Sequence, residues 1–383
     1  MTQLSAHDMI ERLVGIPTVS RDSNLDLIDF VANYLDGFGI EAHLVCDDTG
    51  GKANLYATVG PDAPGGVVLS GHTDVVPIDG QDWSSDPFAP QVRDGRLYGR
   101  GTCDMKGFCA LALALVPEMQ KLRRPVHFAL SYDEEVGCIG APSMIREIAA
   151  HVPEPAAVIV GEPTHMQIVT GHKGIFHFHT HVRGYEAHSS QQNRGVPAIM
   201  YAARLINWMA EKQAELAGGH DLDPRFEPAF TTLHCGVIHG GTAHNITAKD
   251  CHFEADIRSV PGVSAREFFE QLQTYARETL EPMMHAINAQ TGIDFDVTSD
   301  VPSFAVDDYE PAVALLQRLT GQNDTEVVPF AAECGQFQEA GFSVVMCGPG
   351  SIDQAHQPDE FISMQQVEAG LGFLRKVIAD QQT

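Results

Sequence analysis

Three short apolar runs, each ending in ionisable residues, constrain the fold of this chain more than any other feature. They read GVVLSGHTD, VHFALSYDEE and AAVIVGEPT, and they lead into His72 and Asp74, into Glu134 and Glu135, and into Glu162. Continuous apolar runs of this length are typical of buried strands in a mostly parallel sheet. A helix candidate, MKGFCALALALVPEMQKL, separates the first two runs. This alternation indicates an α/β fold, in which ligands bind beyond the carboxyl ends of the strands.

The middle third of the chain has a different pattern. IFHFHTHVRG and CHFEADIRSV alternate apolar with polar residues, as half-buried antiparallel strands do, and an amphipathic helix around VPAIMYAARLINWMAEKQAEL lies between them. The α/β pattern returns later, with FSVVMCGPG as a strand and SMQQVEAGLGFLRKVI as the closing helix. We therefore predict a discontinuous catalytic metal-binding domain at 1–173 and 298–383, with an inserted α+β domain at 174–297.

The charge of the chain argues against two classes of partner. With 24 basic and 51 acidic residues the net charge is −27, whereas nucleic acids and anionic membranes are bound through basic patches. No apolar run reaches the roughly 18 residues of a membrane helix, and the N-terminal segment reads as an amphipathic helix, not a signal peptide. The eight cysteines lack disulfide-like spacing, which favours reduced thiols and a cytoplasmic location.

Two histidines and three carboxylates form a candidate metal centre. They are His72, Asp104, Glu135, Glu162 and His356. Their nitrogen and oxygen atoms suit zinc and neighbouring divalent metals, and they are too many for one catalytic zinc ion, which keeps about three protein ligands. They suit two ions that share a bridging carboxylate, for which we choose Asp104. Asp74, two residues beyond His72, can accept the other ring N–H of that histidine. From spacing alone, structural roles for these scattered residues remain an open alternative.

Two further features resemble metal ligands but are interpreted otherwise. His177, His179 and His181 share one face of a predicted strand, without a carboxylate or cysteine nearby in the sequence. We interpret them as a polar strand face and not as a metal site. Cys103 precedes Asp104, and in an extended segment its side chain is expected to point away from that of Asp104.

The motifs SGHTDVVP, GRGTCDMKG, DEEVG, GEPT and QAHQPDE follow one another along the chain. At these motifs, and through nearly its whole length, the chain resembles the zinc aminoacylase and carboxypeptidase family of co-catalytic metallohydrolases. The resemblance implies one ion on His72, Asp104 and Glu162, and a second on Asp104, Glu135 and His356. The ions would be zinc, with cobalt as a possible substitute, and the peptide bond after Asp104 would be cis.

The resemblance also implies roles for residues outside the ligand set. Glu134 matches the general acid/base that serves a metal-bridged hydroxide, and Asp74 matches the partner of the first metal histidine. In the inserted domain, His188 matches a histidine that reaches a neighbouring subunit's site and stabilises the oxyanion, which implies a homodimer formed through this lid domain. Arg258 and Asn245 match groups that hold the substrate's α-carboxylate. Without the resemblance, a surface ion pair would be the simpler interpretation of Arg258.

Four longer segments are most similar to the branch of the family that acts on N2-acetyl-L-ornithine. They are SGHTDVVPIDGQDWSSDPF, GRLYGRGTCDMKGF, GGTAHNITAKDCHFEADIR and CGPGSIDQAHQPDEF. The expected reaction gives L-ornithine and acetate, a step of arginine biosynthesis, and Glu333 could pair with the side-chain amine of the substrate. The branch that acts on succinyl-diaminopimelate carries an arginine where this chain has FAAECGQF.

However, Ala331 and Ala332 replace the Gly-Thr that usually precedes this acid in the acetylornithine branch. A desuccinylase, or a broader acylamino-acid deacylase or dipeptidase, is therefore the alternative within the class. A metal-free binding protein on the same scaffold is the alternative outside it, although neither the base nor any ligand is missing.

Overall fold

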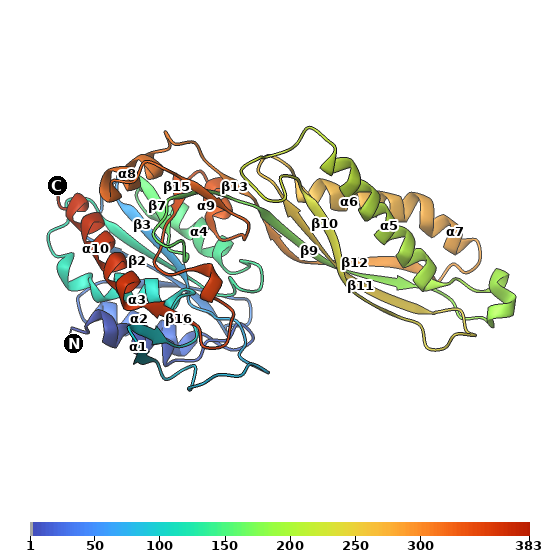
Figure 1. Cartoon of the computed structure of the whole chain (residues 1–383), viewed down its shortest axis with the longest axis horizontal. Coiled ribbons are helices and arrows are strands. Elements are labelled where there is room, and N and C mark those ends of the chain that lie inside the picture. The colour runs from blue at the N-terminus through green and yellow to red at the C-terminus, as the bar shows by residue number, and fades with distance from the viewer. Residues whose placement is uncertain (1–2) are drawn as a thin grey trace. The chain divides into compact units, whose positions relative to one another are not determined.

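The three apolar runs form the central strands of one sheet. In a computed structural model, which describes residues 3–383, they are β3 (Val67–His72), β6 (Val126–Ser131) and β7 (Ala157–Val160), and all three are buried (Figure 1). β3 pairs in parallel with both of the others, and β15 (Val344–Met346) pairs in parallel with β7. The mostly parallel α/β sheet predicted from the sequence is confirmed.

Further strands extend this sheet at both edges, in the order β1-β2-β6-β3-β7-β15-β8-β13 with β14 beside β8, and β1, β2 and β8 pair in antiparallel fashion. The additional strands are β1 (Ala42–Cys46), β2 (Ala53–Val59), β8 (Val169–His172), β13 (Phe304–Ala305) and β14 (Glu326–Val328). A small separate sheet contains β16 (Phe361–Ser363), β5 (Arg96–Tyr98) and β4 (Gln91–Arg93).

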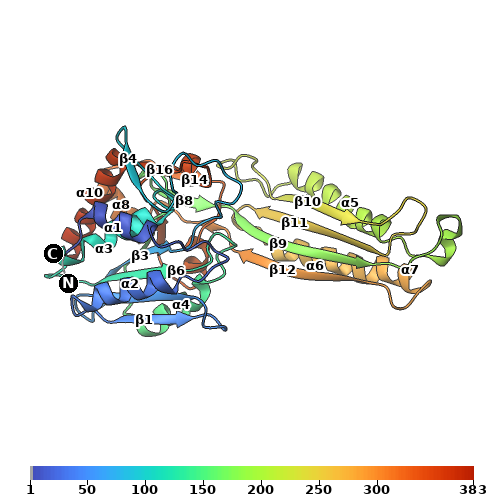
Figure 2. The ribbon, with the colours of Figure 1, turned by 90° about the horizontal axis from the view of Figure 1, so that it is seen from below.

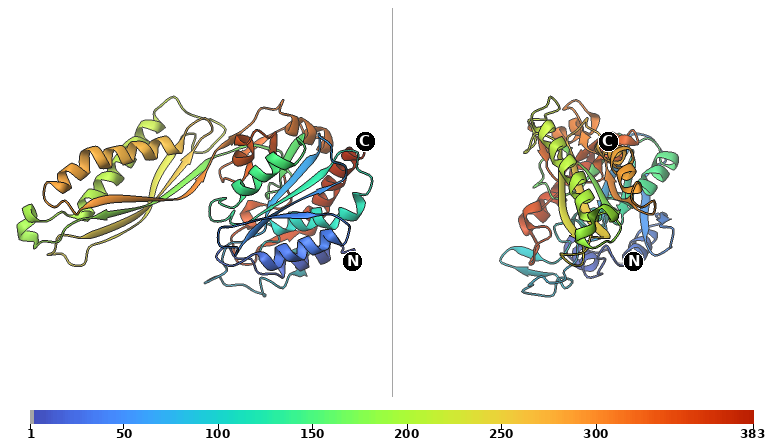
Figure 3. Two further views of the ribbon diagram at one scale, coloured as in Figure 1. Left: turned by 180° about the vertical axis from the view of Figure 1, so that it is seen from behind. Right: turned by 90° about the vertical axis from the view of Figure 1, so that its right-hand side faces the viewer.

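Helices cover both faces of the large sheet. They are α1 (Ala6–Val14), α2 (Leu25–Asp36), α3 (Lys106–Ala114), α4 (Ala141–His151), α8 (Pro311–Thr320), α9 (Cys334–Glu339) and α10 (Met364–Gln381), with 3₁₀ turns η1 (Val116–Glu118) and η4 (Ile352–Gln354). α10 lies in front of the sheet in Figure 1, whereas α4 lies in front when the molecule is seen from behind (Figure 3). Every residue of α3 is buried, and the helix contacts the sheet, α1 and α10, which explains why it is apolar on all sides after Lys106.

The middle of the chain forms an antiparallel sheet with helices on one face. Its strands run in the order β10-β11-β9-β12. They are β9 (Gly174–Arg183), β10 (Thr232–Gly240), β11 (Asp250–Ser259) and β12 (Gly292–Val301). The helical segments are η2 (Ser189–Arg194), α5 (Ala198–Ala217), α6 (Ala265–Tyr275), a π-helical turn η3 (Ala276–Leu280) and α7 (Glu281–His285). Figure 2 shows α6 and α7 behind the strands, and residues such as Phe176, Phe178 and Phe253 fill the core between the layers.

By its internal contacts the chain divides into two units. One contains the chain up to Gly171 together with Phe304–Val327 and Ala332–Thr383, and the other contains His172–Ser303 and Val328–Ala331. Below, they are called the metal unit and the inserted unit. Within residues 3–383, each helix is too short or too polar to cross a membrane.

The exposed face of the inserted sheet corrects one sequence argument. The three histidines of β9 have no carboxylate near them in the sequence, but carboxylates of β11 face them across the sheet. His177 Nε2 lies 3.0 Å from Asp256 Oδ1, and His181 Nε2 lies 2.9 Å from Asp250 Oδ1. These partners lie 79 and 69 positions later in the chain, and only the strand register brings them together. Within residues 3–383, the groups of three ligand atoms near enough to hold one metal ion all lie in the metal unit.

Candidate metal centre

The carboxyl ends of the parallel strands gather the predicted ligands. β3 ends at His72, Glu134 and Glu135 follow β6, and Glu162 follows β7. Asp104 comes from the loop before α3, and His356 comes from the loop after η4. In the first turn of α3, Gly107 allows a close approach to the loop that carries Asp104, since a Cβ there would lie 2.1 Å from the carbonyl oxygen of Thr102. The peptide bond between Asp104 and Met105 is cis, as the resemblance implied.

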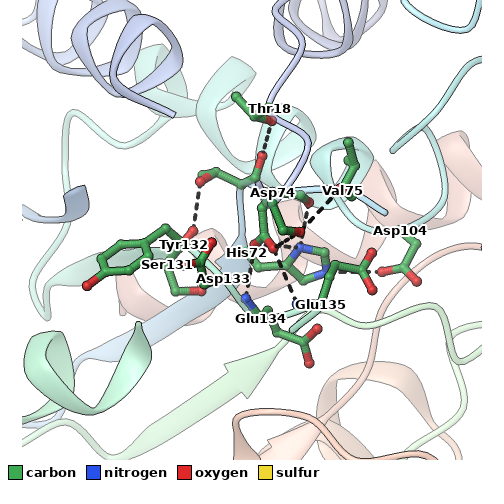
Figure 4. A network of polar contacts seen from close by, with 12 residues as sticks. Thr18, His72, Asp74, Val75, Asp104, Ser131, Tyr132, Asp133, Glu134 and Glu135 are labelled. Atoms are coloured by element: carbon green, nitrogen blue, oxygen red, sulfur yellow. Dashed lines mark hydrogen bonds and ion pairs between the residues drawn. The ribbon is translucent and has the colours of Figure 1, made fainter. Parts of the chain in front are cut away.

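The ring of His72 has a defined orientation (Figure 4). Its Nδ1 lies 2.8 Å from the backbone carbonyl of Asp74, and since a carbonyl only accepts, Nδ1 carries the proton. The other nitrogen, Nε2, therefore presents its lone pair 3.0 Å from Asp104 Oδ1. A lone pair that faces a carboxylate is favourable only when a proton or a cation lies between them, so the arrangement fits a metal ion.

Asp104 presents one oxygen to each of the two histidines. Oδ1 faces His72, whereas Oδ2 lies 3.4 Å from His356 Nε2, which is also 2.9 Å from Glu135 Oε2. Two groups of ligand atoms result, one from His72, Asp104 and Glu162 and one from Asp104, Glu135 and His356, each with its atoms within 4.8 Å of one another. Asp104 belongs to both groups, which is the geometry expected of a bridging carboxylate.

Two carboxylates of this cluster carry a buried oxygen atom that no described residue satisfies. Glu135 Oε1 and Glu162 Oε1 are buried, and neither has a hydrogen-bond partner among the described residues. Burial, and then the charge of Asp104, raises the pKa of Glu135 to about 7, and the same two causes raise the pKa of Glu162 well above its usual value. Buried carboxylates are stable as anions when cations are bound between them, so this donor set fits two divalent ions.

The three consecutive acids after β6 have three different surroundings. Asp133, which has a left-handed backbone (φ 55°), accepts bonds of 2.6 and 2.7 Å from Lys52 Nζ. Glu134 accepts a bond from the thiol of Cys138 at 3.3 Å. Glu135 turns to His356. The turn at Asp133 lets the side chains of two adjacent glutamates approach one site, which strict strand alternation would prevent.

The carboxylate of Asp74 holds this turn more closely than it holds His72. Its two oxygens accept the backbone N–H groups of Glu134 and Glu135 at 3.1 and 3.3 Å, and the hydroxyl of Ser20 at 2.7 Å. The nearest oxygen of this carboxylate lies 3.6 Å from His72 Nδ1, whereas the backbone carbonyl of Asp74 lies 2.8 Å from the same nitrogen. Asp74 thus links the ligand on β3 to the acids that follow β6.

The residues predicted to bind substrate lie in several places. His188 and Asn245 are neighbours in the inserted unit, because the Ser189 N–H donates to the Asn245 carbonyl at 2.9 Å, and both side chains are exposed. Arg258 lies near the carboxyl end of β11, where its Nε donates to Asp256 at 2.9 Å. In the metal unit, Glu333 is 1% exposed and accepts a bond from Ser70 at 3.1 Å.

Sequence reasoning missed several polar residues around the site. Lys52 and Ser20 support the acids after β6, and the sequence carries no local signal for them because their partners lie more than 50 residues away. Glu360 belongs to the motif QAHQPDE but is absent from the predicted site. Its carboxylate accepts the backbone N–H of Asp104 at 3.1 Å, and its position four residues after His356 was the available signal.

An α/β scaffold that gathers two histidines and several carboxylates at one sheet edge defines a metal-dependent hydrolase. Residues 68–380 match Peptidase family M20/M25/M40. The chain belongs to this family, and it is an amidohydrolase.

Similar proteins share its whole length. The chain is 35% identical over 382 residues to an acetylornithine deacetylase of Photorhabdus laumondii, covering 97% of this chain and 95% of that one. In structure it is similar to an M20 family metallo-carboxypeptidase from Sulfolobus solfataricus, with a TM-score of 0.79, 17% identity and full coverage of both chains. It is also similar to a dinuclear metal-binding M20 peptidase of Bacillus subtilis, with a TM-score of 0.63 and 15% identity over 98% of this chain and 97% of that one. These likenesses to solved structures show the fold.

Proposed function

We propose that this chain hydrolyses N2-acetyl-L-ornithine to L-ornithine and acetate, the activity stated in the name of its Photorhabdus relative. The observation that carries the proposal is the pair of ligand groups that share Asp104, with the carboxylate of Glu134 beside them. A cytoplasmic location accords with the eight cysteines, all of which are free thiols.

Two zinc ions are the proposed metals. One would be held by His72, Asp104 and Glu162, and the other by Asp104, Glu135 and His356. Imidazole nitrogen and carboxylate oxygen are ligands that zinc accepts, and cobalt accepts the same set. When bound, the ions polarise the amide carbonyl and make water more acidic at neutral pH.

Glu134 is the proposed general acid and base. Its carboxylate takes a proton from the attacking water, whose oxygen forms the new bond to the acetyl carbon. The same carboxylate then gives that proton to the ornithine nitrogen as the C–N bond breaks. The hydrogen bonds that Asp74 accepts from Glu134 and Glu135 fix the backbone of this turn, so base and ligand keep their separate positions.

Arg258 and Asn245 cannot hold one substrate within a single chain. Asn245 lies in the turn before β11, and the eight-residue span from Asp250, where that strand starts, to Arg258 covers roughly 27 Å at the usual rise per residue. Ornithine is far shorter than this. We therefore infer that Arg258 and Asn245 of one chain serve two different sites, with Arg258 gripping a substrate α-carboxylate and Asn245 and His188 serving the site of a partner subunit.

The exposed edge of the inserted sheet supports a homodimer. β10 is an edge strand, and an unpaired edge is a template for pairing with another chain. Ile238 on this strand is 47% exposed, and Met200 of α5 and Ile246 of the turn before β11 are 61% and 40% exposed. Ile246 bridges to His188, so one of these exposed apolar residues adjoins the histidine that would cross to the partner.

Glu333 is the proposed partner of the side-chain ammonium of ornithine. Its Oε1 is buried and lacks a hydrogen-bond partner within residues 3–383, which leaves it one acceptor for a donor from outside the chain. Replacement by glutamine should raise KM for acetylornithine but leave KM for an N-acetyl neutral amino acid unchanged. Equal changes for the two substrates would refute this role.

The proposed function is tested by kinetics on purified, zinc-loaded protein. Acetylornithine should be hydrolysed well ahead of N-succinyl-diaminopimelate, other acylamino acids and dipeptides. Equal or faster turnover of one of those compounds would reject the substrate and leave the amidohydrolase chemistry intact. Removal of zinc by a chelator should abolish the activity, and addition of zinc or cobalt should restore it.

A further inference from the structure

Two loops that supply candidate ligands meet around one buried ion pair in the metal unit. Arg100 and Glu360 are 1% and 0% exposed in their side chains, and Arg100 Nη1 donates to Glu360 Oε2 at 2.7 Å. Arg100 belongs to the loop that leads to Asp104, and Glu360 follows His356 by four residues. The ion pair thus joins the two loops that would hold the second metal ion.

Glu360 fixes the backbone on the Asp104 side. Its carboxylate accepts the N–H groups of Gly101, Cys103 and Asp104 at 2.9 to 3.1 Å, in addition to the bond from Arg100. Charge-assisted bonds of this kind are stronger than bonds between neutral groups. The Asp104 loop is therefore rigidly anchored.

In the other loop, the side chain of His356 is held less firmly. His356 itself has a left-handed backbone (φ 61°), and its side chain is 49% exposed, so little packing restrains its ring. The position of this imidazole then depends on the backbone that carries it. Gln81 reaches that backbone, since its Nε2 donates to the His356 carbonyl at 2.9 Å.

The network determines which way the Gln81 amide faces. Arg100 Nη2 lies 2.7 Å and Trp83 Nε1 lies 3.0 Å from Gln81 Oε1, and both of these groups can only donate. The amide oxygen must therefore face them, which turns the NH₂ group toward His356. The amide of Gln81 therefore has a fixed orientation, and it connects the buried Arg100 to the loop that carries His356.

We propose that Gln81 is a positioning residue for the second metal ion: it holds the His356 loop at a fixed separation from the Asp104 loop. This inference rests on the proposed function, because it requires that His356 is a metal ligand. Supporting residues of this kind typically contribute 10- to 100-fold to metal affinity. Because Gln81 acts through the backbone of its ligand, we expect a loss of about tenfold at the second ion.

The sharpest test is Gln81→Glu, which keeps an acceptor for Arg100 and Trp83 but replaces the donor to His356 with a carboxylate oxygen. Zinc is titrated calorimetrically into metal-free protein. Wild-type protein should bind two ions, and the variant should bind the first as wild type does and the second about tenfold more weakly. Gln382→Glu is the matched control, because Gln382 Nε2 makes the same kind of bond to the carbonyl of Glu118, at 3.1 Å. This control variant should bind both zinc ions as tightly as wild-type protein does.

A His356→Ala background separates positioning from a general effect on the fold. There, Gln81→Glu should leave the affinity of the remaining ion unchanged. If Gln81→Glu binds both ions as wild type does, or weakens the remaining ion in the His356→Ala background, the positioning role is refuted. If Gln81→Glu does not fold, Gln81→Met, which lacks the donor and the new charge, replaces it with the same expected result. Failure of the wild-type protein to bind two ions would instead reject the proposed function, and this inference with it.

Discussion

Replacement of Lys52 by methionine should destabilise the metal unit far more than loss of a surface charge would. The ammonium group makes two bonds to Asp133, and the two side chains are only 19% and 9% exposed. Removing one partner of a buried ion pair leaves an uncompensated charge and costs about 3–5 kcal/mol, and we expect about 3 kcal/mol because Lys52 is partly exposed. An exposed pair would contribute under about 1 kcal/mol.

A double-mutant cycle isolates this pair. Asp133→Asn removes the charge and suits the left-handed backbone at this position, since asparagine adopts it more readily than most residues. The double variant Lys52→Met/Asp133→Asn should therefore recover more than half of the loss caused by Lys52→Met alone, because no buried charge remains without a partner.

The assay is urea unfolding of zinc-saturated protein, followed by tryptophan fluorescence. The chain has two tryptophans, and only Trp83 lies in the metal unit, so each variant is made in a Trp208→Phe background. A loss under about 1 kcal/mol for Lys52→Met, or a double variant no more stable than that single variant, would show that the pair contributes no more than a surface contact.

Three further predictions concern catalysis, pH dependence and assembly. Glu134→Gln should retain both zinc ions and lose about 10²- to 10⁴-fold in kcat, whereas Glu135→Gln should lose one ion, and metal analysis with steady-state kinetics checks both; a Glu134→Gln enzyme with a tenth of wild-type kcat would exclude Glu134 as the base. Burial lowers the pKa of His127 to about 4, so between pH 6.5 and 4 the unfolded chain binds more protons than the folded one. Stability should fall by about 3 kcal/mol as pH drops through this window, and His127→Gln should remove that part of the slope in urea unfolding measured at each pH; an unchanged slope contradicts the burial argument. Ile238→Lys should convert a dimer to monomers in sedimentation experiments and abolish activity, and an active monomer would reject the shared site.

Much of the metal unit could be predicted because its signals are local. The buried strands appear in the sequence as continuous apolar runs, and parallel strands place the residues that follow them at one edge. That geometry brings His72, Glu135 and Glu162 together, although the runs are dozens of residues apart. The exposed and buried faces of the inserted sheet can likewise be predicted, because apolar and polar residues alternate along its strands.

What could not be predicted depends on pairings across the fold. The register of β9 and β11 decides that His177 faces Asp256, and no property of either segment alone reveals it. The link from Asp133 to Lys52 joins residues 81 positions apart. The role of the Asp74 carboxylate also differed from expectation, because a two-residue spacing fixes neither which of its oxygens faces His72 nor which backbone groups it accepts.

The two ligand groups differ in how open they are to solvent, and this sets an order for metal exchange. His72, Asp104 and Glu162 are all buried, whereas the group with Glu135 ends in the half-exposed ring of His356. An ion held in the outer position would leave by release of a ring that already touches water, whereas an ion held in the inner position would need a larger opening. Brief dialysis against chelator should therefore empty the outer position first. Cobalt added afterwards would give a mixed zinc–cobalt enzyme, with the spectroscopically visible ion next to His356.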